Sequence, residues 1–209
     1  MILPSDVCPP TSEEVGFFKL PVNQIAEWLK QRLDAGRKSK WLIQSPHRGS
    51  LDELCELMRP LASIGVNRYI FIPLEEWSVV VNNAILGTDL GMIHSLAARD
   101  GMCMAIRAVA GRERPDAFAG TVLEVYDPMA PDLTLRLRRS ISAIDDGGKW
   151  RFDQEGDPYP FESLDLYSRR SIRDRFTSDT LRDYLLALGV PVVKSSALRV
   201  EQAILLRKV

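Results

Sequence analysis

Two runs of β-branched and aromatic residues lie close together near the middle of this 209-residue chain. They are residues 69–72 (YIFI) and residues 77–81 (WSVVV), and Pro73 and Glu75-Glu76 lie between them. Residues of these types favour the half-buried, pleated surface of a β-sheet, and so short a connection joins antiparallel strands. We therefore expect a central β-hairpin, around which the rest of the fold is arranged.

The region after residue 130 shows the alternation of a strand with one solvent-facing side. Leu133, Leu135 and Leu137 are separated by single polar residues, which is the period of two that β-strands show. We extend this strand to Ile144, after which the turn sequence at 145–148 (DDGG) predicts a return strand over residues 150–152. Further strands are expected at residues 41–43, 103–109, 121–126 and 200–206.

Helical patterns fall between and after these strands. Apolar residues spaced three and four apart predict a helix from residue 22 to Gly36. Ser50 and Glu53 form a capping-box sequence at the start of a second helix, which we expect to end near residues 60–65. Three more helices are expected at residues 87–101, 163–175 and 178–188, whereas the proline-containing residues 1–20 are expected to be irregular.

These elements predict one α+β domain over residues 1–209, with helices packed on one side of a largely antiparallel mixed β-sheet. The hydrophobic fraction of 45% is ordinary for a globular protein. A chain of this length buries roughly 70% of the surface that its unfolded form exposes, which is enough for a substantial core.

Charge and cysteine usage restrict the partners and the compartment. The 27 basic and 28 acidic residues nearly cancel, whereas a protein that binds nucleic acid usually has a basic excess. Cys8, Cys55 and Cys103 are far apart and form no C-x-x-C pair, which favours free thiols in a reducing compartment. The sequence shows neither a signal-peptide pattern nor a long apolar run, so we expect a cytoplasmic protein without membrane or nucleic-acid partners.

Motifs for metal-dependent, nucleotide-dependent and hydrolytic catalysis are absent from the sequence. Its two histidines, His47 and His94, belong to no H-E-x-x-H motif, and phosphate-binding glycine loops and the G-x-S-x-G motif are also missing. We therefore expect no metal and no cofactor. His94 is predicted to be a half-buried, hydrogen-bonded helix residue, and Cys55 and Cys103 are predicted to be core residues.

One acidic arrangement is compatible with catalysis. Pro115-Asp116, followed by Glu124 on a strand, is similar to the first acidic residues of a metal-dependent nuclease. That chemistry also requires a lysine two residues after the glutamate, and Tyr126 occupies this position. A nuclease or transferase whose site contains Asn82, Asp116 and Glu124 is one hypothesis for the function.

Acidic and aromatic residues are concentrated between Phe152 and Ser168, where the chain has no lysine or arginine. One interpretation is a solvated loop that its aromatic side chains anchor to the core. The other is a recognition surface, on which the acids steer a basic partner and the aromatics supply contact area. The residues that would make these contacts are Asp153, Glu155, Asp157, Tyr159 and Glu162.

Several turn glycines, core aromatics and helix caps between residues 65 and 190 together resemble a class of bacterial proteins of roughly 200 residues. They are Trp77-x-x-x-x-Asn82, Gly87-Thr88-Asp89, Asp146-Gly147-Gly148-Lys149-Trp150-x-Phe152, Gly156, Pro160-Phe161-Glu162, Tyr167, Asp174-Arg175-Phe176 and Leu188-Gly189. Some members of this class are similar to immunity proteins of toxin–immunity systems. The resemblance implies a small cytoplasmic protein that binds and blocks a toxin, and it implies no active-site residues.

Three functions therefore remain open. The leading hypothesis is a protein-binding module, an immunity-type inhibitor that occludes the site of a basic toxin domain. The second is the enzyme with an acidic site. The third is a small-ligand sensor or a structural subunit, in which Trp77 and Trp150 could line a pocket, although aromatic residues on strands usually belong to the core.

Overall fold

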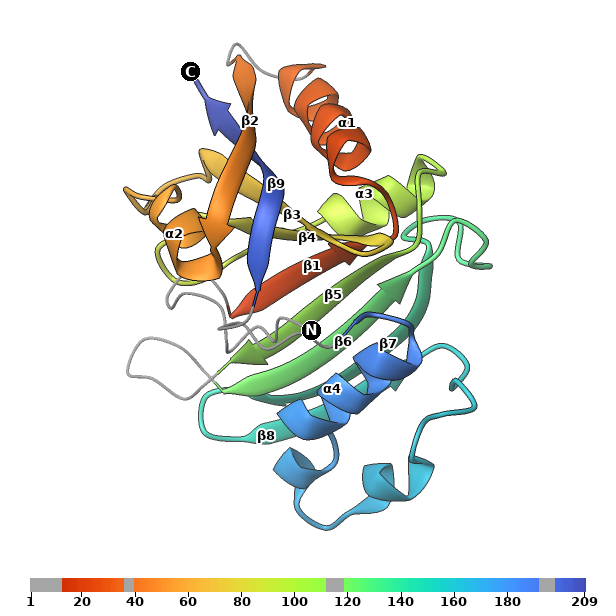
Figure 1. Cartoon of the computed structure of the whole chain (residues 1–209). Coiled ribbons are helices and arrows are strands. Elements are labelled where there is room, and N and C mark those ends of the chain that lie inside the picture. Colours follow the sequence, from red (N-terminus) through yellow and green to blue (C-terminus); the bar gives the residue numbers. More distant parts are fainter. Residues whose placement is uncertain (1–12, 36–39, 112–118, 192–197) are drawn as a thin grey trace.

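The computed structural model describes residues 13–35, 40–111, 119–191 and 198–209 of the chain. Within these residues, nine strands form one sheet in the order β2-β9-β3-β4-β1-β5-β6-β7-β8, and all neighbouring strands are antiparallel (Figure 1). The strands are β1 (Glu14–Phe18), β2 (Trp41–Ser50), β3 (Arg68–Leu74), β4 (Trp77–Asn82), β5 (Ala105–Gly111), β6 (Gly120–Tyr126), β7 (Leu137–Asp145), β8 (Trp150–Glu155) and β9 (Arg199–Lys208).

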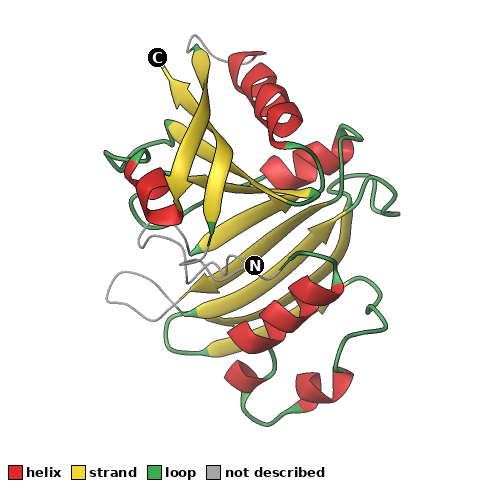
Figure 2. Ribbon diagram, viewed as in Figure 1, coloured by secondary structure: helices red, strands yellow, loops and turns green. Residues whose placement is uncertain are grey.

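Helices cover both faces of this sheet, whereas the sequence led us to expect them on one side. The α-helices are α1 (Val22–Ala35), α2 (Leu51–Glu56), α3 (Ile93–Arg99) and α4 (Ser178–Ala187). Apolar side chains of α2 and α4 belong to one core cluster, and those of α1 and α3 belong to a second cluster on the opposite face. Figure 2 shows α4 across the half of the sheet that contains β6, β7 and β8. The predicted α+β class is confirmed.

The hairpins and helix caps that were predicted from turn and capping sequences are confirmed. Strands β3 and β4 form the central hairpin, and β7 and β8 form the hairpin that the turn at 145–148 predicted. Ser50 caps α2 in a complete capping box with Glu53, as expected from the sequence. Thr177 caps α4 by accepting a hydrogen bond from the Thr180 N–H.

The prediction that residues 1–20 are irregular is wrong for residues 14–18. These residues form the central strand β1 between β4 and β5. All five residues of this strand are buried. The strand forms because it pairs with β4 on one edge and with β5 on the other. The sequence of a five-residue segment does not reveal such distant partners.

Residues 132–136 form a turn in place of the beginning of the predicted strand, so β7 starts only at Leu137. The Asp132 carboxylate accepts hydrogen bonds from the N–H groups of Thr134 and Leu135, and Arg136 has a φ of 60°. Aspartate hydrogen bonds of this kind compete with strand formation, so the leucine alternation is misleading here.

The predicted helix over residues 163–175 is also wrong. Two short 3₁₀ turns, η2 (Leu164–Ser168) and η3 (Ile172–Asp174), occupy this region. The Ser163 N–H donates to the Tyr184 hydroxyl, and Ser171 between the turns is extended. These contacts fix the segment against α4 instead of allowing it to continue as a helix. No helix in the described part of the chain has the length and apolar character needed to cross a membrane.

Candidate functional site

The side chains of β5–β8 that point away from α4 form two parallel rows across the sheet. The pairing register aligns Arg107, Glu124, Ser140 and Glu155 in the first row. The second row is Val109, Val122, Ser142 and Asp153. Residues that lie opposite one another in an antiparallel pair point to the same face, so the eight side chains share one surface. We call this surface the open sheet face.

The open sheet face is accessible to solvent, and its acidic character increases towards its edge. The residues on β5, β6 and β7 are half-buried, and Asp153 and Glu155 on the edge strand β8 are exposed. Neighbouring strands lie about 4.8 Å apart, so Glu124 and Glu155 are roughly 10 Å apart across β7. The face therefore brings Glu124, which was predicted as a residue of an acidic enzyme site, close to two of the predicted partner contacts.

At the inner end of the first row, Arg107 joins two carboxylates. Its Nε donates to Glu14 Oε2 at 2.7 Å, and its Nη1 donates to Glu124 Oε2 at 3.2 Å. The Tyr126 hydroxyl also donates to Glu124 Oε2, at 2.8 Å. Both carboxylates are therefore occupied by partners from neighbouring strands.

Burial and charge shift the ionisation of this network. Burial raises the pKa of Glu14, and the nearby guanidinium of Arg107 offsets only part of that rise. Burial also opposes the charge of Arg107, but Glu14 and Glu124 together raise its pKa. Burial and the adjacent Glu124 carboxylate raise the pKa of Tyr126. Perturbed pKa values occur at functional sites and also in structural ion-pair networks. Because each carboxylate is already hydrogen-bonded to neighbouring residues, we assign this network a structural role.

His94 lies behind this network and is fully buried, not half-buried as predicted. Its ring stacks between Phe18, at 5.1 Å, and Tyr126, at 6.0 Å. Neither ring nitrogen makes a hydrogen bond of ordinary geometry with the described residues, although the Gly91 backbone acts on the pKa of the imidazole as a weak hydrogen-bond partner. Burial and then the Arg107 charge lower its pKa from 6.5 to about 3, so the imidazole is neutral at physiological pH. Cys55 and Cys103 are buried, as predicted.

Asn82 has a structural role at the end of β4. Its amide oxygen accepts from the Asp89 N–H at 3.3 Å, and its amide nitrogen donates to the Asp89 carbonyl. The Leu90 N–H donates to Glu14 Oε1 at 2.9 Å. Asn82 and Glu14 together hold the chain at residues 89–90 against the sheet. The side chain of Asn82 is fully buried and therefore cannot contact a substrate in this conformation.

Asp116, the third residue of the proposed enzyme site, lies outside the described residues. The described parts of the chain contain no group of three or more acidic, histidine or cysteine residues that could hold a metal ion. The structure therefore brings Asn82 and Glu124 onto the same side of the sheet, but both are engaged in hydrogen bonds with their neighbours.

The segment that follows β8 is fixed by a buried ion pair. Arg139 on β7 forms two hydrogen bonds with Glu162, one from Nε to Oε1 at 2.9 Å and one from Nη2 to Oε2 at 2.6 Å. Arg139 Nη1 also donates to the carbonyls of Glu155 and Gly156 at the end of β8. The Tyr167 hydroxyl and the Tyr159 N–H complete the coordination of the carboxylate. One arginine thus fixes both ends of the segment from residue 155 to residue 162.

The five predicted partner contacts divide into two groups. Asp153, Glu155 and Asp157 are exposed, and Tyr159 is half-buried between the Phe161 ring at 5.1 Å and the Arg138 guanidinium at 5.0 Å. Glu162 is different, because its side chain is completely covered and bound to Arg139. Glu162 therefore helps to position the accessible residues Asp153, Glu155, Asp157 and Tyr159, which we call the acidic surface, but it is not part of this surface.

Sequence reasoning did not identify Glu14, Arg107 and Arg139 as site residues. Arg107 is the single charged residue in the otherwise apolar run of residues 105–110. A charge in such a run must be paired when the strand is buried, and this signal could have identified it. Glu14 was hidden in a segment that we expected to be irregular.

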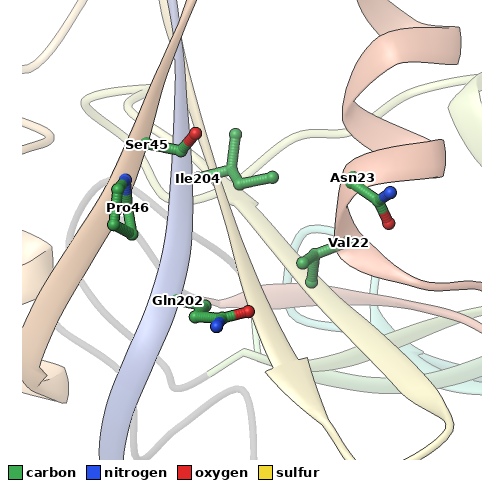
Figure 3. A pocket seen from close by; sticks show the side chains of 6 residues that line it. All are labelled: Val22, Asn23, Ser45, Pro46, Gln202 and Ile204. Carbon is green, nitrogen blue, oxygen red and sulfur yellow. The ribbon is translucent and has the colours of Figure 1, made fainter.

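A shallow pocket of about 340 Å³ lies between β2, β9 and the start of α1 (Figure 3). Its lining residues are Val22, Asn23, Ser45, Pro46, Gln202 and Ile204. This lining contains no charged side chain that would select a ligand. Trp77 and Trp150 do not line the pocket. Trp77 is a core residue whose Nε1 donates to the Gly189 carbonyl at 2.9 Å.

Comparisons with protein-family models, with curated proteins and with solved structures give no match for this chain.

Proposed function

We propose that this protein is a binding module for a basic protein partner, an immunity-type inhibitor that covers the active site of a toxin domain. The observation that supports the proposal most directly is the state of four exposed acidic side chains, Asp153, Glu155, Asp157 and Asp165. None of them forms a salt bridge with another residue in the described parts of the chain. Asp153 and Glu155 lie together on the open sheet face, and unpaired carboxylates grouped in this way attract and orient a partner of opposite charge.

The rigidity of this surface also supports binding. The buried Arg139–Glu162 pair holds the chain from β8 to Tyr159 in one conformation, so less conformational entropy is lost when a partner docks. The half-buried Tyr159 and the aromatic residues behind it supply apolar contact area beside the acids. The mechanism would be steric: the acidic surface occupies a basic catalytic site and excludes its substrate.

The proposal is tested by affinity capture of the tagged protein from its native cells at low and high salt, with mass spectrometry of the retained proteins. We expect one stoichiometric basic protein that is lost at high salt, because screening weakens contacts between exposed charges. The Glu155→Lys variant should fail to retain it. The matched control is Glu27→Lys, which makes the same charge change at an exposed position on α1.

Inhibition is tested separately from binding. When the captured protein is expressed in cells without the present chain, growth should stop, and co-expression of the present chain in the cytoplasm should restore it. A partner that is bound but harmless, or whose toxicity is unchanged by co-expression, would contradict the inhibitor function and leave only the binding function. A retained metal ion or small molecule in place of a protein would favour the enzyme or ligand-binding hypotheses.

A further inference from the structure

We propose that the partner contributes an extended segment that pairs with the free edge of β8 as an additional strand, and that this segment alternates basic and apolar residues. This inference rests on the proposed binding of a basic protein. It adds the conformation of the partner at the contact and the spacing of its charges.

No strand in the described part of the chain pairs with the outer edge of β8. β8 is the last strand of the sheet, and its described neighbour is β7. The 3₁₀ turn η3 contacts both β7 and β8. An element beyond the free edge would lie two strand spacings, roughly 10 Å, from β7, so η3 covers the face of these strands and not the edge. The outward backbone groups of such a strand form a template for another strand.

The two faces of β8 select different side chains. Asp153 and Glu155 project from the open sheet face, two residues apart and exposed, and the exposed Arg151 on the same face of β8 is paired with Asp146. Trp150 and Phe152 project from the opposite face and are half-buried, and Phe152 packs against the Tyr167 ring at 5.2 Å and the Arg175 guanidinium at 5.7 Å. An added strand would place one set of alternate residues beside the two acids and the other set beside the two aromatics. Lysine or arginine suits the first set, and valine, isoleucine or an aromatic residue suits the second.

The charges also restrict pairing of β8 with a second copy of this chain. Two β8 edges paired in antiparallel orientation about residue 154 would bring Asp153 of one copy opposite Glu155 of the other, and like charges on neighbouring strands are destabilising. Pairing about residue 153 would place Arg151 opposite Glu155, but it would also place the two Asp153 side chains opposite each other. A basic segment avoids both repulsions, so the edge favours a partner of opposite charge.

The test uses the full chain and a synthetic seven-residue probe peptide with lysine at odd positions and valine at even positions. Two modified probes carry N-methyl groups on the odd or on the even amides. Each modified probe retains the lysine charges, but its methylated amides cannot donate hydrogen bonds along one of the two edges of the extended peptide. Affinities are measured by titration calorimetry, and the amides of β8 are followed by hydrogen–deuterium exchange.

We expect the unmodified probe to bind and to slow exchange at the alternate β8 amides that do not pair with β7. One of the two methylated probes should bind at least about tenfold more weakly, because several backbone hydrogen bonds are lost. A probe of the same composition with four consecutive lysines should also bind more weakly. Asp153→Lys/Glu155→Lys should abolish binding, whereas Glu27→Lys should leave it unchanged.

Equal binding of the methylated and unmodified probes would overturn strand addition, as would absence of binding at millimolar peptide or exchange protection away from β8. These outcomes differ from failure of the proposed function itself. If a basic protein is captured and depends on Glu155, but the methylated probes bind as well as the unmodified one, the acidic surface binds its partner without an added strand.

Discussion

Arg139 and Glu162 form an ion pair that is almost completely removed from solvent, with 1% and 0% of their side chains exposed. Burial works against both charges, but the paired hydrogen bonds lower the pKa of Glu162 and raise that of Arg139. The two residues are 23 positions apart and connect β7 to the loop that follows β8. The shape of the acidic surface therefore depends on residues that are not part of it.

Removal of one partner of this pair should be strongly destabilising. We expect Glu162→Gln to lower the free energy of unfolding by about 3–5 kcal/mol, because the guanidinium of Arg139 would remain buried without a counter-charge. Denaturant unfolding, followed by circular dichroism, measures this change. The matched control is Asp157→Asn, an exposed acid in the same segment, which should shift stability by less than about 0.5 kcal/mol. Equal effects of the two substitutions would refute the structural role of the pair.

The buried imidazole of His94 should make stability depend on pH. Its folded-state pKa of about 3 lies below the ordinary value of 6.5, so the unfolded chain binds a proton first as the pH falls. The stabilisation is present above pH 6.5 and is lost progressively towards pH 3. For this shift we expect a loss of roughly 2 kcal/mol between pH 7.5 and pH 5.

His94→Phe retains a ring between Phe18 and Tyr126 but removes the titration, so this part of the pH dependence should disappear. The raised pKa of Glu14 acts in the opposite direction, because the folded state gains stability as this carboxyl is protonated. Comparison of the variant with the wild type isolates His94. Parallel curves of unfolding free energy against pH for the two proteins would show that His94 is not responsible.

Gly16 allows β1 to pass close beneath α3 and the chain at Leu90. A Cβ atom at this position would lie 2.5 Å from Leu90 Cδ1 and 2.7 Å from His94 Nε2. We expect Gly16→Ala to cost about 1–3 kcal/mol through overpacking. Leu90→Ala in the same chain should relieve one of the two contacts, so the double variant should be more stable than the sum of the single effects predicts. Strict additivity in this double-mutant cycle would contradict the close approach.

The sequence predicted the elements whose chemistry is local. The turn at 145–148 and the capping box of Ser50 and Glu53 depend on residues within a few positions of one another, and both were predicted correctly. The formation of β1, in contrast, depends on distant pairing. Its residue Gly16 lies opposite Val80 and Arg107, which are 64 and 91 residues away along the chain. No local pattern contains that information.

The same distinction applies to the candidate site. The composition of residues 152–168 indicated an acidic surface, and Asp153, Glu155 and Asp157 are indeed exposed. Composition could not separate Glu162 from them, because its burial depends on Arg139 from another strand. The alignment of Glu124 with Glu155 follows from the registers of two successive strand pairs, which the sequence does not specify.

The most direct test of the binding function is the affinity of the captured basic partner, measured by titration calorimetry over a range of salt concentrations. The wild type, Asp153→Lys/Glu155→Lys and Glu27→Lys are compared. We predict that affinity falls with salt for the wild type and for Glu27→Lys, and that the double variant binds at least about tenfold more weakly with a smaller salt dependence. Equal affinity and equal salt dependence for all three proteins would contradict a binding surface at Asp153 and Glu155.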